Sequence, residues 1–277
     1  MSDTRPASGV RDWDAATYDR VSGPQLAWGR AVVERLPLEG DETVLDAGCG
    51  SGRVTKLLLE RLPRGHVIAV DSAPSMVEEA RAALDDERVE VFAADLTELK
   101  LDEPVDVVFS TAVFHWVEDH DLLFRRLHAA LRPGGLLVAQ CGGTGNVRRF
   151  HELTRAVAEQ DPFAEYLAGW EGPWNFRSPE DTSESLTAAG FVEPDCWLER
   201  QDIKPPEPRT FLRTVCLGHH LDALPESLRD EFVARVADLM EADEGWATEK
   251  LNITARSGDP ATLDYVRLNI AARKGRA

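Results

Sequence analysis

Short apolar runs alternate with amphipathic segments along the first 145 residues of the chain. The apolar runs are continuous, as in strands that are buried on both faces. The segments between them carry apolar residues at the three- and four-residue spacing of a helix. This alternation is typical of parallel strands joined by crossover helices. It predicts strands at Thr43–Asp46, His66–Val70, Val89–Ala93, Val105–Ser110 and Leu136–Gln140, and helices at Val54–Leu62, Pro74–Leu84 and His120–Leu131.

The pattern changes after residue 145, where helical segments dominate and strand-like ones become rare. Ser178 and Pro179 have the character of a helix N-terminus, and Gly190 that of a stop. The last helical segment places Leu228, Phe232, Val236 and Met240 on one stripe. The other elements that we predict here are a helix at Arg148–Glu159 and strands at Val192–Leu198 and Thr262–Ala271.

These elements predict an α/β fold, with a Rossmann-like, doubly wound, seven-stranded and mostly parallel sheet. A helical cap is inserted after the fifth strand. We expect four regions: an N-terminal lid segment at 1–30, a cofactor-binding core at 31–145, a cap or substrate region at 146–261 that is interleaved with a strand near 192–198, and a closing strand at 262–277.

Composition excludes several classes of protein. The formal net charge is −18, with 31 Lys and Arg against 49 Asp and Glu, which argues against nucleic acid because phosphate binding needs a positive surface. The four cysteines show no metal-ligand spacing and are typical of reduced thiols. No apolar stretch is long enough to span a membrane, and the polar N-terminus shows no signal peptide. We expect a cytoplasmic protein, a monomer or weak homodimer, without a metal.

A glycine turn follows the first predicted strand, in the sequence V-L-D-A-G-C-G-S-G at 44–52. Glycines there let a ligand approach the backbone closely and present free N–H groups at a helix N-terminus. The dinucleotide fingerprint needs a small residue where Arg53 stands, and the P-loop needs a lysine after Gly52. Both phosphate-binding motifs are therefore disfavoured, and a plain tight turn is the alternative to a ligand site.

Three acids stand at the ends of three successive strands: Asp46, Asp71 and Asp95. Asp46 precedes the first glycine, where an anion suits a cationic ligand better than a phosphate. Asp71 is placed to accept from both hydroxyls of a ribose, and Asp95 from an exocyclic amine. A turn-capping role is the alternative for Asp95. All three acids open onto the carboxyl edge of the sheet, where ligands of such sheets bind.

Together with A-A-D-L at 93–96 and L-R-P-G-G at 131–135, these residues resemble a class I S-adenosylmethionine-dependent methyltransferase. The resemblance covers the first 145 residues. It implies that Gly48, Gly50 and Gly52 shape the turn under the methionine end of the cofactor, and that Asp95 and Leu96 recognise adenine. The full set of cofactor-binding residues that it implies is Trp13, Tyr18, Asp46, Ala47, Gly48, Gly50, Gly52, Asp71, Ser72, Met76, Asp95, Leu96, Ala112, His115 and Trp116.

A narrower resemblance is carried by W-D-A-A-T-Y-D at 13–19, S-T-A-V-F-H-W-V at 110–117 and D-Y-V-R-L-N-I-A-A-R-K at 264–274. These segments are similar to trans-aconitate methyltransferases, which methylate a carboxylate of a small polycarboxylic acid. In that group Trp13 and Tyr18 would belong to a segment that closes over the cofactor. The loop C-G-G-T-G-N at 141–146 and the aromatic segment G-W-E-G-P-W-N-F at 169–176 depart from the group.

The sequence says less about the residues that bind the substrate than about those that bind the cofactor. Methyl transfer from a sulfonium needs alignment and exclusion of water. His115 is the candidate catalytic base, with a structural role as the alternative, and His219 and His220 read as a solvated helix end. An acid would need an arginine, and Arg148, Arg149, Arg177 and Arg213 are available. The predicted substrate-binding residues are Tyr18, His115, Asn146, Trp170, Trp174, Arg177 and Arg213.

We therefore expect an S-adenosylmethionine-dependent methyltransferase that O-methylates a small carboxylic acid. One alternative is a hydroxyl, amine or carbon of a natural product as the acceptor. A second alternative is a protein that binds the cofactor without catalysis. A third and more distant alternative is a nicotinamide-dependent dehydrogenase.

Overall fold

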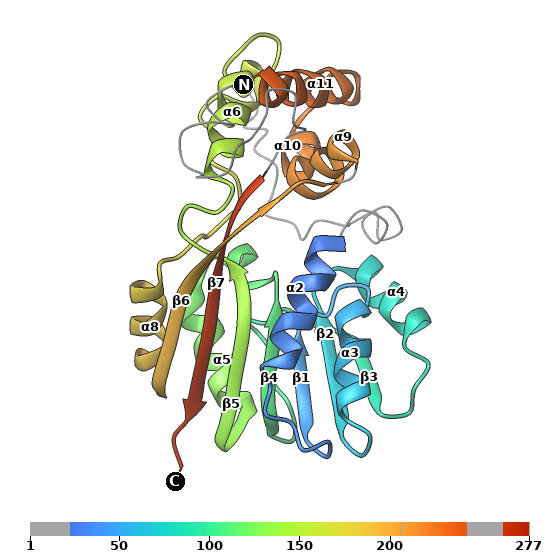
Figure 1. Ribbon diagram of the computed structural model, residues 1–277, viewed down its shortest axis with the longest axis vertical. Helices are drawn as coiled ribbons and strands as arrows, with labels where there is room; N and C mark the ends of the chain where they lie inside the picture. Colours follow the sequence, from blue (N-terminus) through green and yellow to red (C-terminus); the bar gives the residue numbers. More distant parts are fainter. Residues whose placement is uncertain (1–22, 206, 243–262, 277) are drawn as a thin grey trace.

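The computed structural model describes residues 23–205, 207–242 and 263–276. Seven strands form one sheet in the order β3-β2-β1-β4-β5-β7-β6 (Figure 1). The first five strands run parallel, whereas β7 runs antiparallel to both β5 and β6. The strands are β1 (Thr43–Ala47), β2 (His66–Asp71), β3 (Val89–Ala93), β4 (Val105–Thr111), β5 (Leu131–Gly142), β6 (Phe191–Ile203) and β7 (Leu263–Lys274).

Helices cover both faces of this sheet because successive strand residues point to opposite sides. Val44 packs with α2 and α3 on one face, and its neighbour Leu45 packs with α5 on the other. A capped helix, α8, lies beside α5, and its N-cap Ser178 accepts a hydrogen bond from the backbone N–H of Asp181. These helices are α2 (Gly23–Glu34), α3 (Arg53–Arg61), α4 (Pro74–Ala83), α5 (His120–Ala130) and α8 (Pro179–Ala188), with the single turn η1 (Phe114–Trp116) after β4.

A second group of helices, which we call the helical group, lies beyond the carboxyl ends of the parallel strands (Figure 1). It has an apolar core of its own, in which Phe150, Phe163, Phe211 and Phe232 are fully buried. Its members are α6 (Arg148–Ala158), α7 (Ala164–Leu167), α9 (Pro208–Phe211), η2 (Leu212–Cys216), α10 (Gly218–Ala223) and α11 (Glu226–Ala242).

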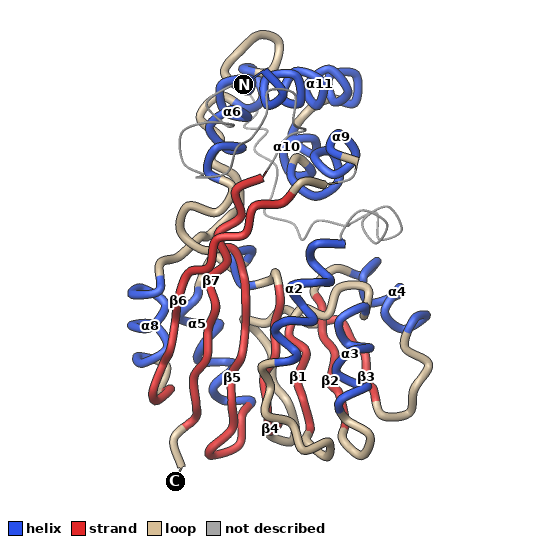
Figure 2. The backbone as a smooth tube through the Cα atoms, viewed as in Figure 1, coloured by secondary structure: helices blue, strands red, loops and turns tan. Residues whose placement is uncertain are grey.

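The long strands β6 and β7 connect the sheet to the helical group, as the red tube of Figure 2 shows. Ile270 and Ala272 of β7 belong to the core between the sheet and α5. Leu263 and Tyr265, at the start of the same strand, belong to the core of the helical group. One strand thus joins two cores.

The predicted seven-stranded, mostly parallel sheet is confirmed, and two local predictions need correction. The fifth strand begins at Leu131 instead of Leu136, because Leu131 already pairs with Val105 of β4. Helix α8 falls inside the range 146–261 but packs on the sheet and α5. None of the described helices is long and apolar enough to cross a membrane.

Candidate active site

A cavity of about 1130 Å³, which we call the main cavity, lies between the carboxyl edge of the sheet and the helical group. Ligands of open α/β sheets bind at this edge. Most of the predicted site residues line the cavity: Asp46, Gly48, Gly50, Asp71, Ser72, Met76, Asp95, Leu96, Ala112, His115, Trp116, Asn146 and Trp174.

The glycine turn after β1 forms the floor of the cavity. Gly48 has φ +86°, and a Cβ there would lie 2.2 Å from a methyl group of Val113. Gly50 has φ +54°, with no atom within 4 Å of the position of a Cβ. The two glycines act differently: Gly48 is required by close packing, and Gly50 leaves open space above the backbone.

Asp71 is held in one orientation by the backbone. Its Oδ2 accepts from the N–H of Gly50 at 2.9 Å, and its Oδ1 accepts from the N–H of Ala73 at 2.9 Å. Burial raises the pKa of Asp71, and these hydrogen bonds counteract that rise. Each oxygen keeps a second lone pair for a ligand hydroxyl.

Asp46 is the most buried acid of the site, with 2% of its surface exposed. The hydroxyl of Thr55 donates to its Oδ2 at 2.7 Å. Burial raises the pKa of Asp46 to about 7, the Thr55 hydrogen bond lowers it, and the nearby charge of Asp71 raises it further. A positive group of a ligand beside Asp46 would favour the ionised form.

Asp95 has the turn-capping contacts of the alternative interpretation and also lines the main cavity. Its Oδ1 accepts from the backbone N–H of Thr97 at 2.8 Å and from the Thr97 hydroxyl at 2.7 Å. These two bonds fix the carboxylate at the rim. The two interpretations of Asp95 are therefore compatible.

His115 lines the cavity as a neutral imidazole. The backbone N–H of Gly142 donates to its Nδ1 at 3.2 Å, so the ring proton resides on Nε2. Burial lowers its pKa well below 6.5, and the positive charges of Arg267 and His120 lower it further. The predicted role as a general base does not fit this tautomer, because Nε2 has no lone pair to accept a proton.

Arg267 is a cavity residue that the sequence analysis missed. It is 2% exposed, and its Cζ lies 4.5 Å from the centre of the Trp28 ring. Its positive charge contributes, after burial, to the lowered pKa of His115, which lines the same cavity. The arginines chosen from the sequence lie elsewhere: Arg177 donates to the carbonyl of Asp181, and Arg213 forms an exposed ion pair with Asp230.

A buried chain of side chains orients Arg267. Its Nε donates to Oε1 of Gln140 at 3.3 Å, and Nε2 of Gln140 donates to Oδ1 of Asn269 at 2.8 Å. Arg35, which directly follows α2, donates to the same Asn269 oxygen at 2.7 Å. Arg267 and Asn269 occupy alternate positions of β7 and so share one face of the strand.

Three further histidines, His151 of α6 and His219 and His220 of α10, belong to the helical group. His151 and His219 line the main cavity, and His220 is only 5% exposed. The expected solvated helix end at His219 and His220 is therefore wrong. The ring of Trp174 packs at 4.6 Å from that of His151 and at 5.5 Å from that of His220, which explains the burial.

Three more of the predicted residues that the structure describes, Ala47, Gly52 and Trp170, do not line the main cavity. Ala47 is fully buried in β1, and Gly52 packs against Leu84. Trp170 lines a separate, smaller cavity. Trp13 and Tyr18 lie outside the described residues.

Comparison with known proteins agrees with this geometry. The family described as "Methyltransferase domain" matches residues 44–135, from β1 to the start of β5. The trans-aconitate 2-methyltransferase of Methylobacterium nodulans is 32% identical, with 96% of this chain and 100% of the relative covered. That of Variovorax paradoxus is 33% identical, with 80% and 86% covered. The YcgJ protein of Bacillus subtilis has a similar fold, with a TM-score of 0.63 at 14% identity over 91% of this chain and 100% of that chain.

The ionisation of Asp46 makes the stability of the ligand-free protein depend on pH. Its folded pKa of about 7 exceeds the ordinary value of 3.8, so the folded state holds a proton that the unfolded state has lost between these values. Stability therefore falls as the pH rises from 4 to above 7. Asp46→Asn should raise the free energy of unfolding by roughly 3 kcal/mol at pH 8, and by less than about 1 kcal/mol at pH 4. Urea unfolding at both pH values measures this, and an equal effect at both would contradict it.

Proposed function

The chain belongs to the trans-aconitate 2-methyltransferase family of S-adenosylmethionine-dependent methyltransferases, and on this premise we propose that it O-methylates a carboxylate of a small organic acid. The observation that carries the proposal is Arg267, a buried guanidinium in the wall of the main cavity that His115 also lines. A guanidinium offers two parallel N–H donors that match the two oxygens of a carboxylate.

The residues at the strand ends suit the cofactor. Asp71, fixed by two backbone amides, would accept from the ribose hydroxyls. The open space above Gly50 would take the backbone-contacting part of the methionine moiety. Asp46, buried with a raised pKa, would gain from a cationic group nearby. Asp95 and Leu96 would border the adenine, as the family resemblance implies.

When bound, S-adenosylmethionine supplies an electrophilic methyl group on a sulfonium, which leaves as a neutral thioether. A carboxylate oxygen forms the new bond to the methyl carbon as the carbon–sulfur bond breaks, so no proton has to be removed. Arg267 would hold the acid, and the N–H at Nε2 of His115 would donate to an acid oxygen. The aromatic rings of Trp116, Trp174 and Phe176 line the same cavity and exclude water from it.

A hydroxyl or amine acceptor is less well supported. Such a nucleophile often needs a general base, and His115 has its only ring lone pair bound to Gly142. Burial first, and then the charge of Arg155, lower the pKa of His151 to about 4, which makes it a weak base. A carboxylate avoids this requirement because it is already ionised at neutral pH.

We also propose that a single copy of the chain forms the site, in keeping with a monomer or weak homodimer. The predicted lid segment with Trp13 and Tyr18, and the helical group as the cap over the acid, are part of the same proposal.

The proposed function is tested by the formation of S-adenosylhomocysteine with a panel of small acids and phenols. We expect turnover with at least one di- or tricarboxylic acid, with a methyl ester as the product in mass spectrometry. Turnover with phenols alone would favour the hydroxyl alternative. The absence of product from every acceptor, with cofactor binding intact, would favour a non-catalytic binding protein.

Arg267 should matter for the acid and much less for the cofactor. Arg267→Leu removes a buried charged hydrogen-bond donor, so the KM for the acid should rise by about 10- to 100-fold. Steady-state kinetics at saturating cofactor measures this. Arg273→Leu, an exposed position of the same strand, is the matched control and should leave the KM unchanged. A KM that stays the same in Arg267→Leu would refute the assignment.

The affinity for S-adenosylmethionine should depend on the ionisation of Asp46. Because the pKa of Asp46 is about 7 without ligand, most of the carboxylate is protonated at pH 6, and the Kd should rise about tenfold between pH 8 and pH 6. Asp46→Asn should abolish this dependence in calorimetric titrations. The same titrations with S-adenosylhomocysteine, which lacks the sulfonium but keeps the ammonium group, distinguish the two cations. A pH dependence that persists with this ligand indicates that the ammonium group faces Asp46, and one that disappears indicates the sulfonium. A flat profile for both ligands would contradict the prediction.

A further inference from the structure

The part of the main cavity around Arg267 is lined by aromatic rings. The Cζ atom of Arg267 lies 4.5 Å from the centre of the Trp28 ring, and that ring packs on the ring of Tyr265 at 4.8 Å. Trp28 and Tyr265 line the main cavity and belong to the apolar core of the helical group. The guanidinium therefore lies on an apolar wall.

Phe176 is a further ring close to Arg267. Gly142 of β5 is the register partner of Arg267 on β7, and the side-chain positions of such a pair share one face of the sheet. A Cβ at Gly142 would lie 2.6 Å from a ring carbon of Phe176 and 2.8 Å from Nδ2 of Asn146. The ring of Phe176 thus takes the side-chain position directly opposite Arg267.

The loop that carries Phe176 is fixed to η1. The backbone N–H of Asn175 donates to the carbonyl oxygen of His115 at 2.8 Å. The side-chain amide of Asn175 donates to the carbonyl oxygens of Val117 at 3.1 Å and Glu118 at 3.0 Å. The ring of Phe176 stacks on that of His115 at 5.7 Å. These contacts fix the position of the Phe176 ring before a ligand binds.

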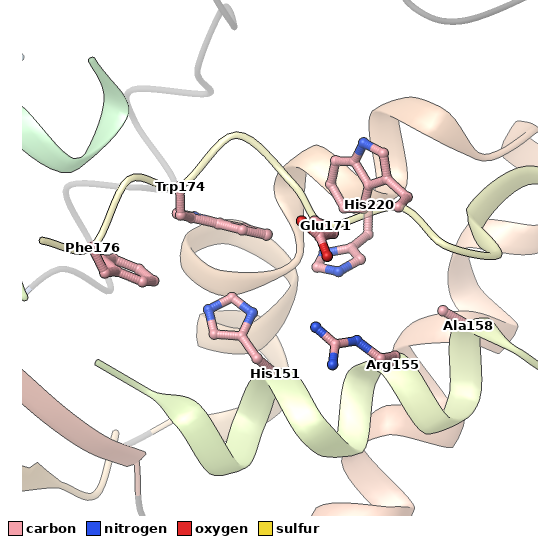
Figure 3. Close-up of a pocket in the computed structure, with 8 residues that line it drawn as sticks. His151, Arg155, Ala158, Glu171, Trp174, Phe176 and His220 are labelled. Carbon is pink, nitrogen blue, oxygen red and sulfur yellow. The ribbon is translucent and has the colours of Figure 1, made fainter. Parts of the chain in front are cut away.

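Trp174 continues the aromatic surface from the same loop. Its ring lies 6.2 Å from that of Trp116 and 4.6 Å from that of His151, which faces it from α6 (Figure 3). Trp116, Trp174 and Phe176 line the main cavity and are only partly buried. Large rings that the protein leaves partly uncovered offer apolar surface to a ligand.

Positive charge is scarce in this part of the cavity. Among the lining residues that the structure describes, Arg53 and Arg267 are the only arginines, and there is no lysine. Arg53 begins α3 directly after the glycine turn, on the cofactor side. Burial lowers the pKa of His115 well below 6.5 and that of His151 to about 4, so both rings are uncharged at neutral pH. An acid whose carboxylate is held by Arg267 would therefore direct the rest of its structure toward aromatic rings.

The volume of the main cavity, about 1130 Å³, also favours a bulky acceptor. A site for one small-molecule ligand measures roughly 300–1,000 Å³. The main cavity exceeds this range, so it can hold the cofactor together with an acid that is larger than a short aliphatic one.

We propose that the carboxylic acid methylated by this chain carries an aromatic group, which packs on the rings of Trp116, Trp174 and Phe176 while Arg267 holds the carboxylate. The inference rests on the proposed function and names the class of acid. Rings pack on one another edge-on or offset, with their centres about 4.5–7 Å apart, and such pairs are more stable than burial of the same area alone. An aromatic group therefore suits this surface better than an alkyl chain.

The experiment measures kcat/KM for methyl ester formation with pairs of acids that differ only in an aromatic substituent. The pairs are propionate with 3-phenylpropionate and succinate with benzylsuccinate, so the number of carboxylates is constant within each pair. The aromatic member should have a kcat/KM about 10- to 100-fold higher in both pairs, because its ring leaves water for an apolar surface. Hexanoate, which has an apolar chain instead of a ring, should gain less over propionate than 3-phenylpropionate does.

Calorimetry provides a measurement that is independent of turnover. 3-Phenylpropionate is titrated at several temperatures into enzyme saturated with S-adenosylhomocysteine. The heat capacity change of binding should be negative, because apolar surface is buried. A heat capacity change of zero would contradict the packing of the phenyl group on the rings.

Phe176→Gln and Trp174→Gln each replace a ring by a polar chain. Either change should lower kcat/KM for 3-phenylpropionate by about 5- to 20-fold and that for propionate by less than about threefold. Tyr166→Gln is the matched control, because Tyr166 is an exposed aromatic residue of α7 that lines neither the main cavity nor the smaller one. It should leave both values unchanged. Thermal stabilisation by S-adenosylhomocysteine, equal to that of the wild type, verifies that each variant is folded.

The outcomes separate this inference from the proposed function. If the aromatic substituent brings no gain in either pair, or if the two glutamine variants weaken both acids equally, the aromatic subsite is refuted and a carboxylic acid remains the substrate class. A gain for hexanoate as large as that for 3-phenylpropionate would refute the choice of a ring. The absence of turnover with every acid, with cofactor binding intact, would refute both proposals. A gain in both pairs that the glutamine variants reduce and Tyr166→Gln preserves supports the subsite.

Discussion

The reversed direction of β7 determines how the half of the site that we assign to the acid is assembled. Because β7 runs antiparallel between β5 and β6, its first residues reach the edge at which the five parallel strands end. Tyr265 and Arg267 therefore face the main cavity, while Ile270 and Ala272, farther along, fill the core against α5. A parallel strand in this place would carry the guanidinium to the opposite edge of the sheet.

The same geometry separates the charges of the site. The acids stand at the ends of β1, β2 and β3, and the buried guanidinium comes from the other half of the sheet. The cavity thus has a negative floor for a cationic cofactor and a positive wall for an anionic acceptor. The net charge of −18 therefore says little about the substrate, since the local field of a cavity depends on the few charges that line it.

The sequence allowed the sheet and the cofactor half of the site to be predicted, because both depend on local patterns. A strand that ends in an acid and a glycine turn can be recognised in a few consecutive residues. Ala47 was predicted to bind the cofactor but does not line the main cavity. Alternation along β1 directs its side chain into the core, next to the cavity-lining Asp46. Gly52 belongs to the packing of α3 on α4, where Leu84 takes the space of a side chain.

The acid half of the site depends on contacts that no local pattern contains. Arg267 stands in an apolar strand in which Leu263, Tyr265, Arg267 and Asn269 alternate with residues of the other face, and this alternation was an available signal. The signal shows that the face is partly polar, but only the sheet order brings it against Gln140 of β5 and against Arg35, which follows α2. His220 escapes prediction for a similar reason, since its burial requires Trp174 from a loop far away in the sequence.

Because the histidines are buried, the acid-binding half and the cofactor-binding half of the site should respond differently to pH. Since His115, His151 and His220 are neutral at physiological pH, guanidinium groups supply the positive charge that we assign to acid binding. A guanidinium stays protonated throughout the working range. On the cofactor side, the pKa of Asp46 is about 7, so its carboxylate changes charge within that range. Any pH dependence of the complete reaction near neutrality should therefore originate in cofactor binding, with recognition of the acid nearly constant.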